Sequence, residues 1–323
     1  MTLSRKQFLS LSAATALTSK RSFSQDSAPL LSRIKYATIG APSVDAIERY
    51  YTTWLGHTVV EKSTVSTPMA NSWGAPNAAG RPFILMQPST GEDVMIRAVE
   101  IEPVAGYKAM STVGWNSFEI IVNDVDDLHK RLQTSAFRHI GGPANLGGGT
   151  SSIRASQYIG PAEEVIYFNC ETGDRSQSNL PDPGNDVGRT NIVILASNNT
   201  SDTMNYYRKM FGLGQGFDRP TPIGVIARAQ GLPEDHKYLL GFITLAEPGN
   251  AIEFDEYLNQ FGQRPRSKGH LPQGNAMVTF NVDDIDAIAA DFFSAPITEY
   301  GGRRSATFSG PAGELVELIE EAR

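Results

Sequence analysis

The sequence lacks three features that would place it in a well-defined class. It has one cysteine, Cys170, in 323 residues, so neither an internal disulfide framework nor a cysteine-rich metal site is available. It has no uninterrupted apolar run near the roughly 18 residues that a membrane span needs. It has no basic excess, because 28 Lys and Arg stand against 35 Asp and Glu, and the formal charge of −7 disfavours a nucleic-acid partner. These absences leave an acidic protein of ordinary globular composition, long enough for two domains.

The first 25 residues form a segment of their own. A basic start, Ser4-Arg5-Lys6-Gln7, precedes about ten small and apolar residues that end near Leu17, which is the layout of a signal peptide. The start resembles a twin-arginine export signal, with Lys6 in place of the second arginine. The alternative is a disordered basic tail. We expect export, so that the mature protein would be periplasmic or secreted.

Internal repetition is the most informative feature of the rest of the chain. The segment Val122-Asn-Asp-Val-Asp-Asp-Leu128 recurs as Val282-Asp-Asp-Ile-Asp-Ala-Ile288. Each copy follows an apolar, β-rich run and predicts the start of an amphipathic helix, which the aspartates would cap. A second repeat predicts a turn and then a strand; its copies are Gly160-Pro-Ala-Glu-Glu-Val-Ile-Tyr-Phe168 and Gly310-Pro-Ala-Gly-Glu-Leu-Val-Glu-Leu318.

A weaker repeat lies earlier in each half of the chain. A predicted strand (36–40 or 191–195) leads into a predicted helix with a Tyr-Tyr pair, Tyr50-Tyr51 or Tyr206-Tyr207. Each helix is expected to end at a glycine, Gly56 or Gly212. The chain therefore holds four strand–helix–strands units, and the loops 65–79 and 220–235 within them are long enough to act as lids.

This fourfold pattern resembles the vicinal oxygen chelate superfamily, which includes glyoxalase I, extradiol dioxygenases and bleomycin-resistance proteins. The resemblance covers residues 33–323. It implies an α+β fold of four βαβββ modules, paired into two domains whose curved sheets enclose pockets. We expect a signal over residues 1–25, an N-terminal paired domain over 33–172, a linker over 173–188 and a C-terminal paired domain over 189–323.

The resemblance also implies a test for a metal site. Metal-binding members of this superfamily carry His or Gln on the first strand of a module and Glu on the last strand. The first strands here offer Tyr36, Ser117, Asn191 and Met277, and the last strands offer Arg97, Tyr167, Glu253 and Glu317. Because no first strand carries a histidine, we expect no stoichiometric iron or zinc. A weakly held Mg²⁺, Mn²⁺ or Ca²⁺ at Glu253 and Glu317 would be compatible with these residues.

The two halves of the chain differ in what these positions provide. The N-terminal half has no carboxylate there, and its Arg97 would either hold an anionic substrate group or form a salt bridge on the surface. The C-terminal half has Glu253 and Glu317. If both line one pocket, the two carboxylates face each other and bind a hard cation or act as an acid–base pair. The alternative is that both are structural and bond to backbone or arginine.

Three functions follow from these positions. The first is an exported enzyme of lyase or isomerase type that uses Glu253 and Glu317 as catalytic groups instead of a histidine-bound redox metal. The second is a non-catalytic protein that sequesters an aromatic or anionic ligand, as bleomycin-resistance proteins do. The third, an extradiol-type dioxygenase, would need the missing histidines. In each case the partner is a small molecule, bound by Asn191, Met277, Arg97, Tyr36, Ser117 or Tyr167, and no tightly bound cofactor is expected. The oligomeric state is open.

The first testable prediction concerns the N-terminus. Because signal peptidases remove the apolar segment of an export signal, we expect the mature protein to begin between Leu17 and Leu31 and to lie outside the cytoplasm. N-terminal sequencing of protein from its native host checks this, and a chain that begins at Met1 or Thr2 would contradict it.

Overall fold

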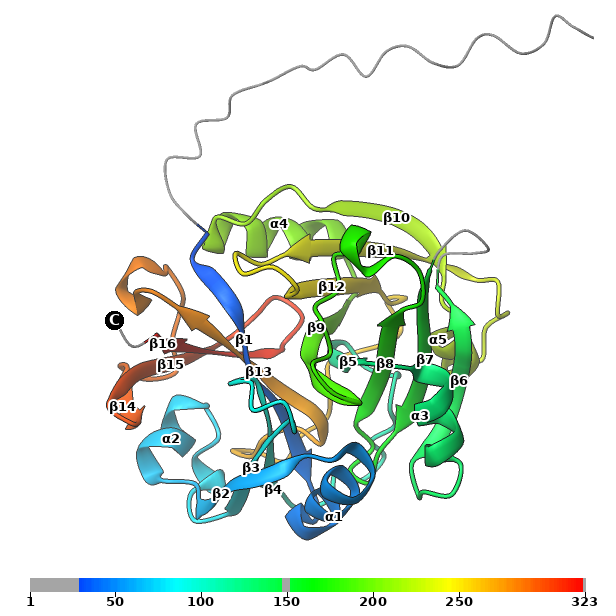
Figure 1. The fold of residues 1–323 in the computed structure, drawn as a ribbon. Coiled ribbons are helices and arrows are strands. Elements are labelled where there is room, and N and C mark those ends of the chain that lie inside the picture. The colour runs from blue at the N-terminus through cyan, green and yellow to red at the C-terminus, as the bar shows by residue number, and fades with distance from the viewer. Residues whose placement is uncertain (1–28, 147–151, 322–323) are drawn as a thin grey trace, which may run out of the picture.

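The computed structural model describes residues 29–146 and 152–321 (Figure 1). The predicted export signal, residues 1–25, lies outside the described residues. The described chain contains four modules in which a strand, a helical segment and three more strands follow one another. This confirms the predicted α+β fold of four βαβββ modules. The strands form two eight-stranded sheets that curl into half-barrels.

The first sheet joins the first and fourth modules. Its strand order is β14-β15-β16-β13-β1-β4-β3-β2, with β1 and β13 antiparallel at the seam. The first module contributes β1 (Leu31–Ala41), β2 (Thr58–Thr64), β3 (Pro82–Gln87) and β4 (Met95–Glu100). The fourth contributes β13 (Gly274–Val282), β14 (Ile297–Tyr300), β15 (Arg303–Ser309) and β16 (Leu315–Glu320).

The second sheet joins the second and third modules. Its strand order is β10-β11-β12-β9-β5-β8-β7-β6, with β5 and β9 antiparallel at the seam. The second module contributes β5 (Gly114–Val122), β6 (Arg138–Asn145), β7 (Ile153–Ile159) and β8 (Val165–Glu171). The third contributes β9 (Val187–Ser197), β10 (Phe217–Pro222), β11 (Lys237–Thr244) and β12 (Ala251–Glu256).

The two modules within residues 33–172, and the two within 189–323, therefore do not join each other in one sheet, which differs from the paired domains expected there. Residues 33–172 contribute one module to each sheet, and so do residues 189–323. The segment between them holds only the short 3₁₀ helix η2 (Arg175–Gln177) among its described elements. All four first strands are apolar and present a similar edge, so their local sequences do not select a partner strand. Packing of the whole chain makes that selection.

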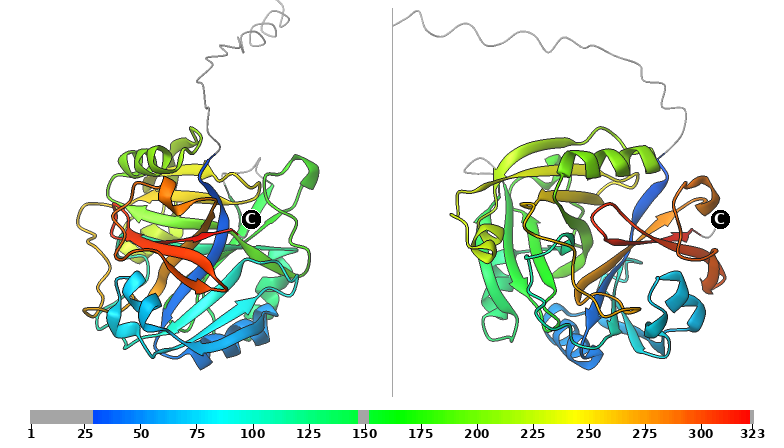
Figure 2. Two further views of the ribbon diagram at one scale, coloured as in Figure 1. Left: turned by 90° about the vertical axis from the view of Figure 1, so that its left-hand side faces the viewer. Right: turned by 180° about the vertical axis from the view of Figure 1, so that it is seen from behind.

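Helices α1 (Val44–Leu55), α3 (Val125–Leu132) and α4 (Thr200–Phe211) begin and end as the repeats predict. Asp124 caps α3 by accepting hydrogen bonds from the N–H groups of the next two aspartates. Gly56 and Gly212 end α1 and α4 in the left-handed conformation, with φ of 69° and 63°. Helices α1 and α4 lie at opposite ends of the molecule (Figure 2). No helix in the described ranges is both long and apolar enough to cross a membrane.

The fourth module departs from the prediction of an amphipathic helix after Asp284. Only the 3₁₀ helix η3 (Ile285–Ala287) forms there. The chain beyond it packs against β15 instead: the rings of Phe292 and Phe308 lie 6.2 Å apart, edge to face. The Phe293 N–H donates to the Thr307 carbonyl. These tertiary contacts outweigh the local preference for helix.

The two sheets pack back to back over one hydrophobic core. Ile39 of β1, Phe280 of β13 and Val193 of β9 are fully buried in it. The Trp115 ring of β5 lies 6.2 Å from Phe280, and its Nε1 donates to the Leu315 carbonyl of the first sheet. Because strand side chains alternate in direction, the opposite face of each sheet turns away from this core and lines the interior of its half-barrel.

Two buried tyrosine–glutamate hydrogen bonds cross between the sheets. Tyr51 of α1 donates to Glu164 Oε1 at 3.3 Å, and Tyr207 of α4 donates to Glu314 Oε1 at 2.8 Å. Each glutamate also accepts the backbone N–H two residues before it at 2.8 Å. Burial raises the pKa of Glu164 to about 8 and the pKa of Glu314 to about 7. The glutamate of the repeated Gly-Pro-Ala-x-Glu turn thus has a structural role.

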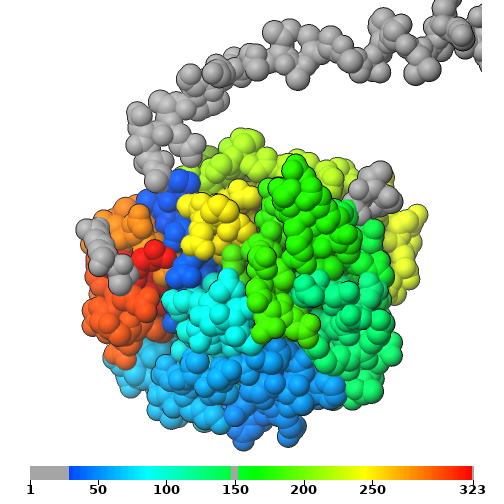
Figure 3. Space-filling model, in the orientation of Figure 1, coloured from blue at the N-terminus to red at the C-terminus, as the bar shows by residue number. Residues whose placement is uncertain are grey.

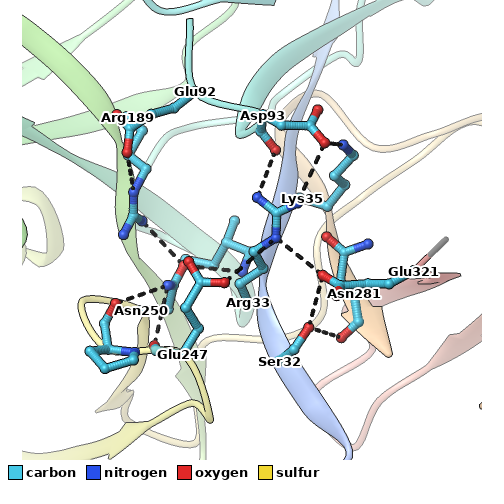
Figure 4. A network of polar contacts seen from close by, with 12 residues as sticks. Ser32, Arg33, Lys35, Glu92, Asp93, Arg189, Glu247, Asn250, Asn281 and Glu321 are labelled. Carbon is cyan, nitrogen blue, oxygen red and sulfur yellow. Dashed lines mark hydrogen bonds and ion pairs between the residues drawn. The ribbon is translucent and has the colours of Figure 1, made fainter. Parts of the chain in front are cut away.

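A polar network ties the start of β1 to both sheets (Figure 4). Arg33 forms ion pairs with Asp93 at 3.4 Å and Glu321 at 3.2 Å. Asn250 Oδ1 accepts from the β1 backbone and from Arg189, each at 3.2 Å. In the space-filling view the start of β1 (blue) lies between yellow and red segments of the chain (Figure 3). The network therefore fixes the chain where the two sheets meet.

Each of the two long loops carries a short helix that bridges the edges of one sheet. The loop between β2 and β3 holds α2 (Thr67–Ser72) and η1 (Pro76–Ala78), and α2 packs against β14 at the far edge of the first sheet. The loop between β10 and β11 holds α5 (Gly224–Gln230), which packs against β6 at the far edge of the second sheet. Each half-barrel thus encloses an interior, called below the first and second interior after its sheet.

The raised pKa values predict how stability depends on pH. Glu164 and Glu314 bind their protons more tightly in the folded than in the unfolded protein. Their contribution to the free energy of unfolding is therefore complete below their ordinary pKa of 4.5 and is lost as the pH rises through about 7 to 8. We expect the free energy of unfolding to fall between about pH 4.5 and about pH 8. Glu164→Gln and Glu314→Gln keep the hydrogen bonds but remove the titration, so both should flatten this fall. Denaturant titrations measure it, and the partly exposed neighbour variant Glu163→Gln should behave like wild type.

Candidate functional site

The first interior is built around an arginine–glutamate ion pair. Arg97 of β4 and Glu317 of β16 are both fully buried, and Arg97 Nη2 lies 2.8 Å from Glu317 Oε2. The strand register brings them together, because Arg97 stands beside Thr38 on β1 and Glu317 stands beside Thr279 on β13. The salt bridge predicted as one alternative for Arg97 therefore forms, but inside the protein rather than at the surface. Binding of a substrate anion by Arg97 stays a prediction.

Both oxygens of Glu317 are saturated with hydrogen bonds. Oε1 accepts from Trp73 Nε1 at 2.7 Å and from the Tyr300 hydroxyl at 2.6 Å. Oε2 accepts from Thr279 at 2.6 Å and from Arg97. A carboxylate with four donors has no free lone pair directed at a substrate. The prediction of Glu317 as a catalytic base is therefore not supported by its surroundings.

The loop between β2 and β3 fills the space above the ion pair of the first interior. The Arg97 guanidinium lies 4.7 Å from the ring of Trp73, which follows α2, and 5.2 Å from the ring of Tyr36. Met277 is fully buried among apolar side chains below it. Tyr36 and Arg97 border a remaining cavity of about 280 Å³ at the rim. Of the expected ligand-binding residues, Tyr36, Arg97 and Met277 are thus brought together, in an interior that is largely packed.

Glu253 lies in the other half-barrel, so the predicted confrontation of Glu253 with Glu317 is wrong. Glu253 is on β12 of the second sheet, whereas Glu317 is on β16 of the first. The cause is the module pairing, because the third and fourth modules belong to different sheets. A cation shared by these two glutamates would have to bridge two separate interiors.

The second interior gathers three carboxyl groups around a tyrosine. Glu119 of β5 stands beside Tyr167 of β8, and Glu253 and Asp255 follow each other on one face of β12. Glu119 and Asp255 are 3% and 1% exposed, whereas Glu253 keeps partial access to solvent. All three carboxyl groups lie close enough to the Tyr167 hydroxyl for their negative charges to raise its pKa.

Burial and mutual repulsion favour the neutral forms of these groups. Burial raises the pKa of Glu119 to about 7. The hydrogen bond that Asn169 Nδ2 donates to it at 2.6 Å acts in the opposite direction, because it favours the charged form. Burial and Glu119 raise the pKa of Asp255 to about 8. Burial, Asp255 and Glu119 raise the pKa of Glu253 well above its ordinary value, with only Arg219 acting in the other direction. The three groups therefore share fewer than three negative charges near neutral pH and titrate as a set.

Several buried polar atoms in this region have no hydrogen-bond partner among the described residues. They include the Tyr167 hydroxyl, Ser117 Oγ and both oxygens of Asp255. Each is at least nine-tenths buried. Leaving such groups unpaired costs stability, so the arrangement is typical of a place where a ligand supplies the missing partners. Ser117, Tyr167 and Glu253 are thus brought together as predicted residues of one interior.

Asn191 is placed differently from the prediction, because it falls at a bulge of β9. Glu119 pairs with Ile192 and Ile120 pairs with Thr190, so the ladder passes over Asn191. Sequence reasoning missed Glu119 and Asp255 as site residues. The available signal was the two-residue period, since Glu119 follows Ser117 and Asp255 follows Glu253 on the same strand face.

Known proteins were compared with this architecture. No model of a protein family matches the sequence, and no curated protein matches it. Glyoxalase I from Zea mays is similar in structure with a TM-score of 0.60 at 16% identity, covering 89% of this chain and 92% of that chain. A putative dioxygenase from Bacillus subtilis has a TM-score of 0.60 at 12% identity, covering 92% of this chain and 87% of that chain. The chain has the vicinal oxygen chelate fold.

In the first interior, the positions at which metal-binding members of the superfamily carry their metal ligands hold side chains that do not fit a metal. There the Arg97 guanidinium, itself a cation, already pairs with Glu317. In the second interior Tyr167 and Ser117 stand where the superfamily would place a carboxylate and a histidine. Within residues 29–146 and 152–321, no three His, Cys, Asp or Glu side chains lie close enough together to hold a metal ion. The absence of stoichiometric iron or zinc stays a prediction.

The ion pair of the first interior predicts a large effect on stability. Glu317→Gln would leave the Arg97 charge buried without a counter-charge, which costs roughly 3–5 kcal/mol. We expect a clearly lower melting temperature by calorimetry. The exposed pair of Arg81 and Glu102 offers a control, because Glu102→Gln should cost about 1 kcal/mol or less. Removing both charges while keeping an acceptor for Trp73, Tyr300 and Thr279, as in Arg97→Gln with Glu317→Gln, should recover part of the loss. A double variant as unstable as Glu317→Gln alone would contradict this account.

Proposed function

We propose that the protein is an exported enzyme of lyase or isomerase type that moves a proton on a small molecule bound in the second interior. The observation that carries the proposal is the set of Glu119, Glu253 and Asp255 around the Tyr167 hydroxyl, with pKa values raised toward neutrality. General acid–base catalysis is most efficient when the pKa of the acting group lies near the working pH. Export rests on the signal-like first 25 residues.

Glu253 is the group that would exchange the proton with substrate. It is the one carboxyl of the three that keeps partial access to solvent. Ionised Glu253 would take a proton from a carbon next to a carbonyl, and the electron pair of the broken C–H bond would move to the carbonyl oxygen. Where the deprotonated carbon carries a hydroxyl group, the hydroxyl proton moves to the former carbonyl oxygen, and return of the abstracted proton to the former carbonyl carbon completes an isomerisation. Where the carbon on the other side of the deprotonated carbon carries a leaving group, the carbonyl re-forms as that group departs with its bonding electrons, which completes an elimination.

The other groups of the second interior would support that transfer. Burial raises the pKa of Tyr167 well above its ordinary value, so its hydroxyl keeps its proton and can donate a hydrogen bond to the developing oxyanion. Glu119 and Asp255 lie close enough to raise the pKa of Glu253 and thus its strength as a base. These are positioning and tuning roles, distinct from contact with the reacting carbon.

The alternative function is sequestration of a small molecule without chemistry. The unpartnered Ser117 and Tyr167 hydroxyls are as compatible with sequestration as with catalysis, because they offer hydrogen bonds to any polar ligand. The two functions differ in whether protons exchange.

Proton exchange gives the test of the proposal. A panel of α-hydroxy ketones and 2-oxo acids is incubated with the protein in heavy water, and loss of the C–H signal beside the carbonyl is followed by proton NMR. For compounds that exchange, Glu253→Gln should slow the exchange by about 10²-fold or more with little change in melting temperature. Glu256→Gln, on the same strand, serves as the control. Binding of the compounds by wild type without any exchange would support sequestration instead.

A further inference from the structure

A row of side chains on one face of the second sheet leads from its edge to Glu253. Phe217 of β10 pairs with Phe242 of β11, and Phe242 pairs with Glu253 of β12. The neighbouring residue Gly241 faces the other way, since a Cβ there would meet Met204 of α4. The row therefore lies on the face opposite α4, which is the face of the second interior.

The two phenylalanines form an aromatic platform beside the candidate base. Their rings are stacked, with centroids 5.6 Å apart and planes inclined by 21°. Phe217 is nevertheless 49% exposed. A large aromatic face left in water beside carboxyl groups is typical of a surface that a ligand ring covers.

Arg219 stands on the same face, one step further along β10. Its guanidinium lies 5.6 Å from the Phe217 ring, and its register partner Leu240 pairs with Asp255. Arg219 has no ion-pair partner among the described residues, whereas Arg189, Arg228 and Arg304 each have one. A free guanidinium beside stacked rings recognises an anionic group on a planar body.

The geometry points to a planar aromatic carboxylate, or a similar planar conjugated anion, as the substrate class: its ring stacks on Phe217 and Phe242, its anionic group pairs with Arg219, and its reacting carbon lies toward Glu253. This inference rests on the proposed function for the location of the base. It does not need a protein partner. β10 is an edge strand, but Pro220 and Pro222 remove two backbone donors, so a peptide strand would pair poorly with it.

Three matched probes separate the contributions to binding. Benzoate has the ring and the charge, benzamide has the ring alone, and cyclohexanecarboxylate has the charge without a planar ring. Titration calorimetry with the full-length protein should rank benzoate as the tightest of the three. Absence of saturable benzoate binding by wild type, or equal affinity for all three probes, would overturn the inference.

Variants assign the effects to residues. Arg219→Gln should weaken benzoate about tenfold and leave benzamide nearly unchanged, because only the charge is removed. Phe217→Leu should weaken both aromatic probes by several-fold and cyclohexanecarboxylate least. Arg208→Gln on the surface of α4 and Phe293→Leu, another exposed phenylalanine, are the controls and should change nothing. Benzoate binding that survives Arg219→Gln unchanged would overturn the inference.

Glu253→Gln separates this inference from the proposed function. The variant should lose proton exchange but bind benzoate at least as well as wild type, because a negative charge beside the ligand is removed. Loss of the Arg219 dependence with exchange intact would refute the substrate class alone. Benzoate binding that depends on Arg219, without exchange on any compound, would refute the enzyme alone.

Discussion

Burial of two glutamates between the sheets is the constraint on which the rest of the structure depends. Glu164 and Glu314 sit in turns of opposite sheets, and each bonds to a tyrosine on a helix of the other sheet. A buried carboxyl group is tolerable only when it is hydrogen-bonded and largely protonated. These bonds therefore hold only when the half-barrels lie back to back. That arrangement turns the two interiors away from each other and makes them independent sites.

The two interiors differ because one pair of equivalent positions holds opposite charges. Arg97 on β4 stands beside Thr38 of β1, and Glu253 on β12 stands beside Ile194 of β9 in the same register. In the first interior the arginine neutralises Glu317, and Trp73 closes over the pair. In the second interior a glutamate adds to two other carboxyl groups. One interior is thus stabilised as a packed core, whereas the other keeps reactive groups without counter-ions.

The second interior is a place where the protein gives up stability. Asp255 has no hydrogen-bond partner among the described residues, and the ionised forms of Glu119, Glu253 and Asp255 repel one another. Hydrophobic residues of similar size would be more stable there. Buried polar groups that lower stability in this way are concentrated at functional sites. The first interior has the same fold, and there the buried carboxylate Glu317 has a counter-charge and a full set of hydrogen bonds.

The local sequence determined the modules, and the tertiary structure decided how they combine. Apolar alternation in strands, capping by aspartates and helix termination by glycines are interactions over a few residues. The sequence therefore predicted the four modules, the glycine ends of α1 and α4, the aspartate cap of α3 and the two long loops. The candidate residues on single strands, such as Ser117, Tyr167 and Glu253, could be found by the same two-residue period. Which strands meet at the seams depends on long-range packing that no local pattern encodes. For that reason Glu253 and Glu317 were expected together and lie apart, and the partners Glu119 and Asp255 emerged only when β5, β8, β9 and β12 were joined in one sheet.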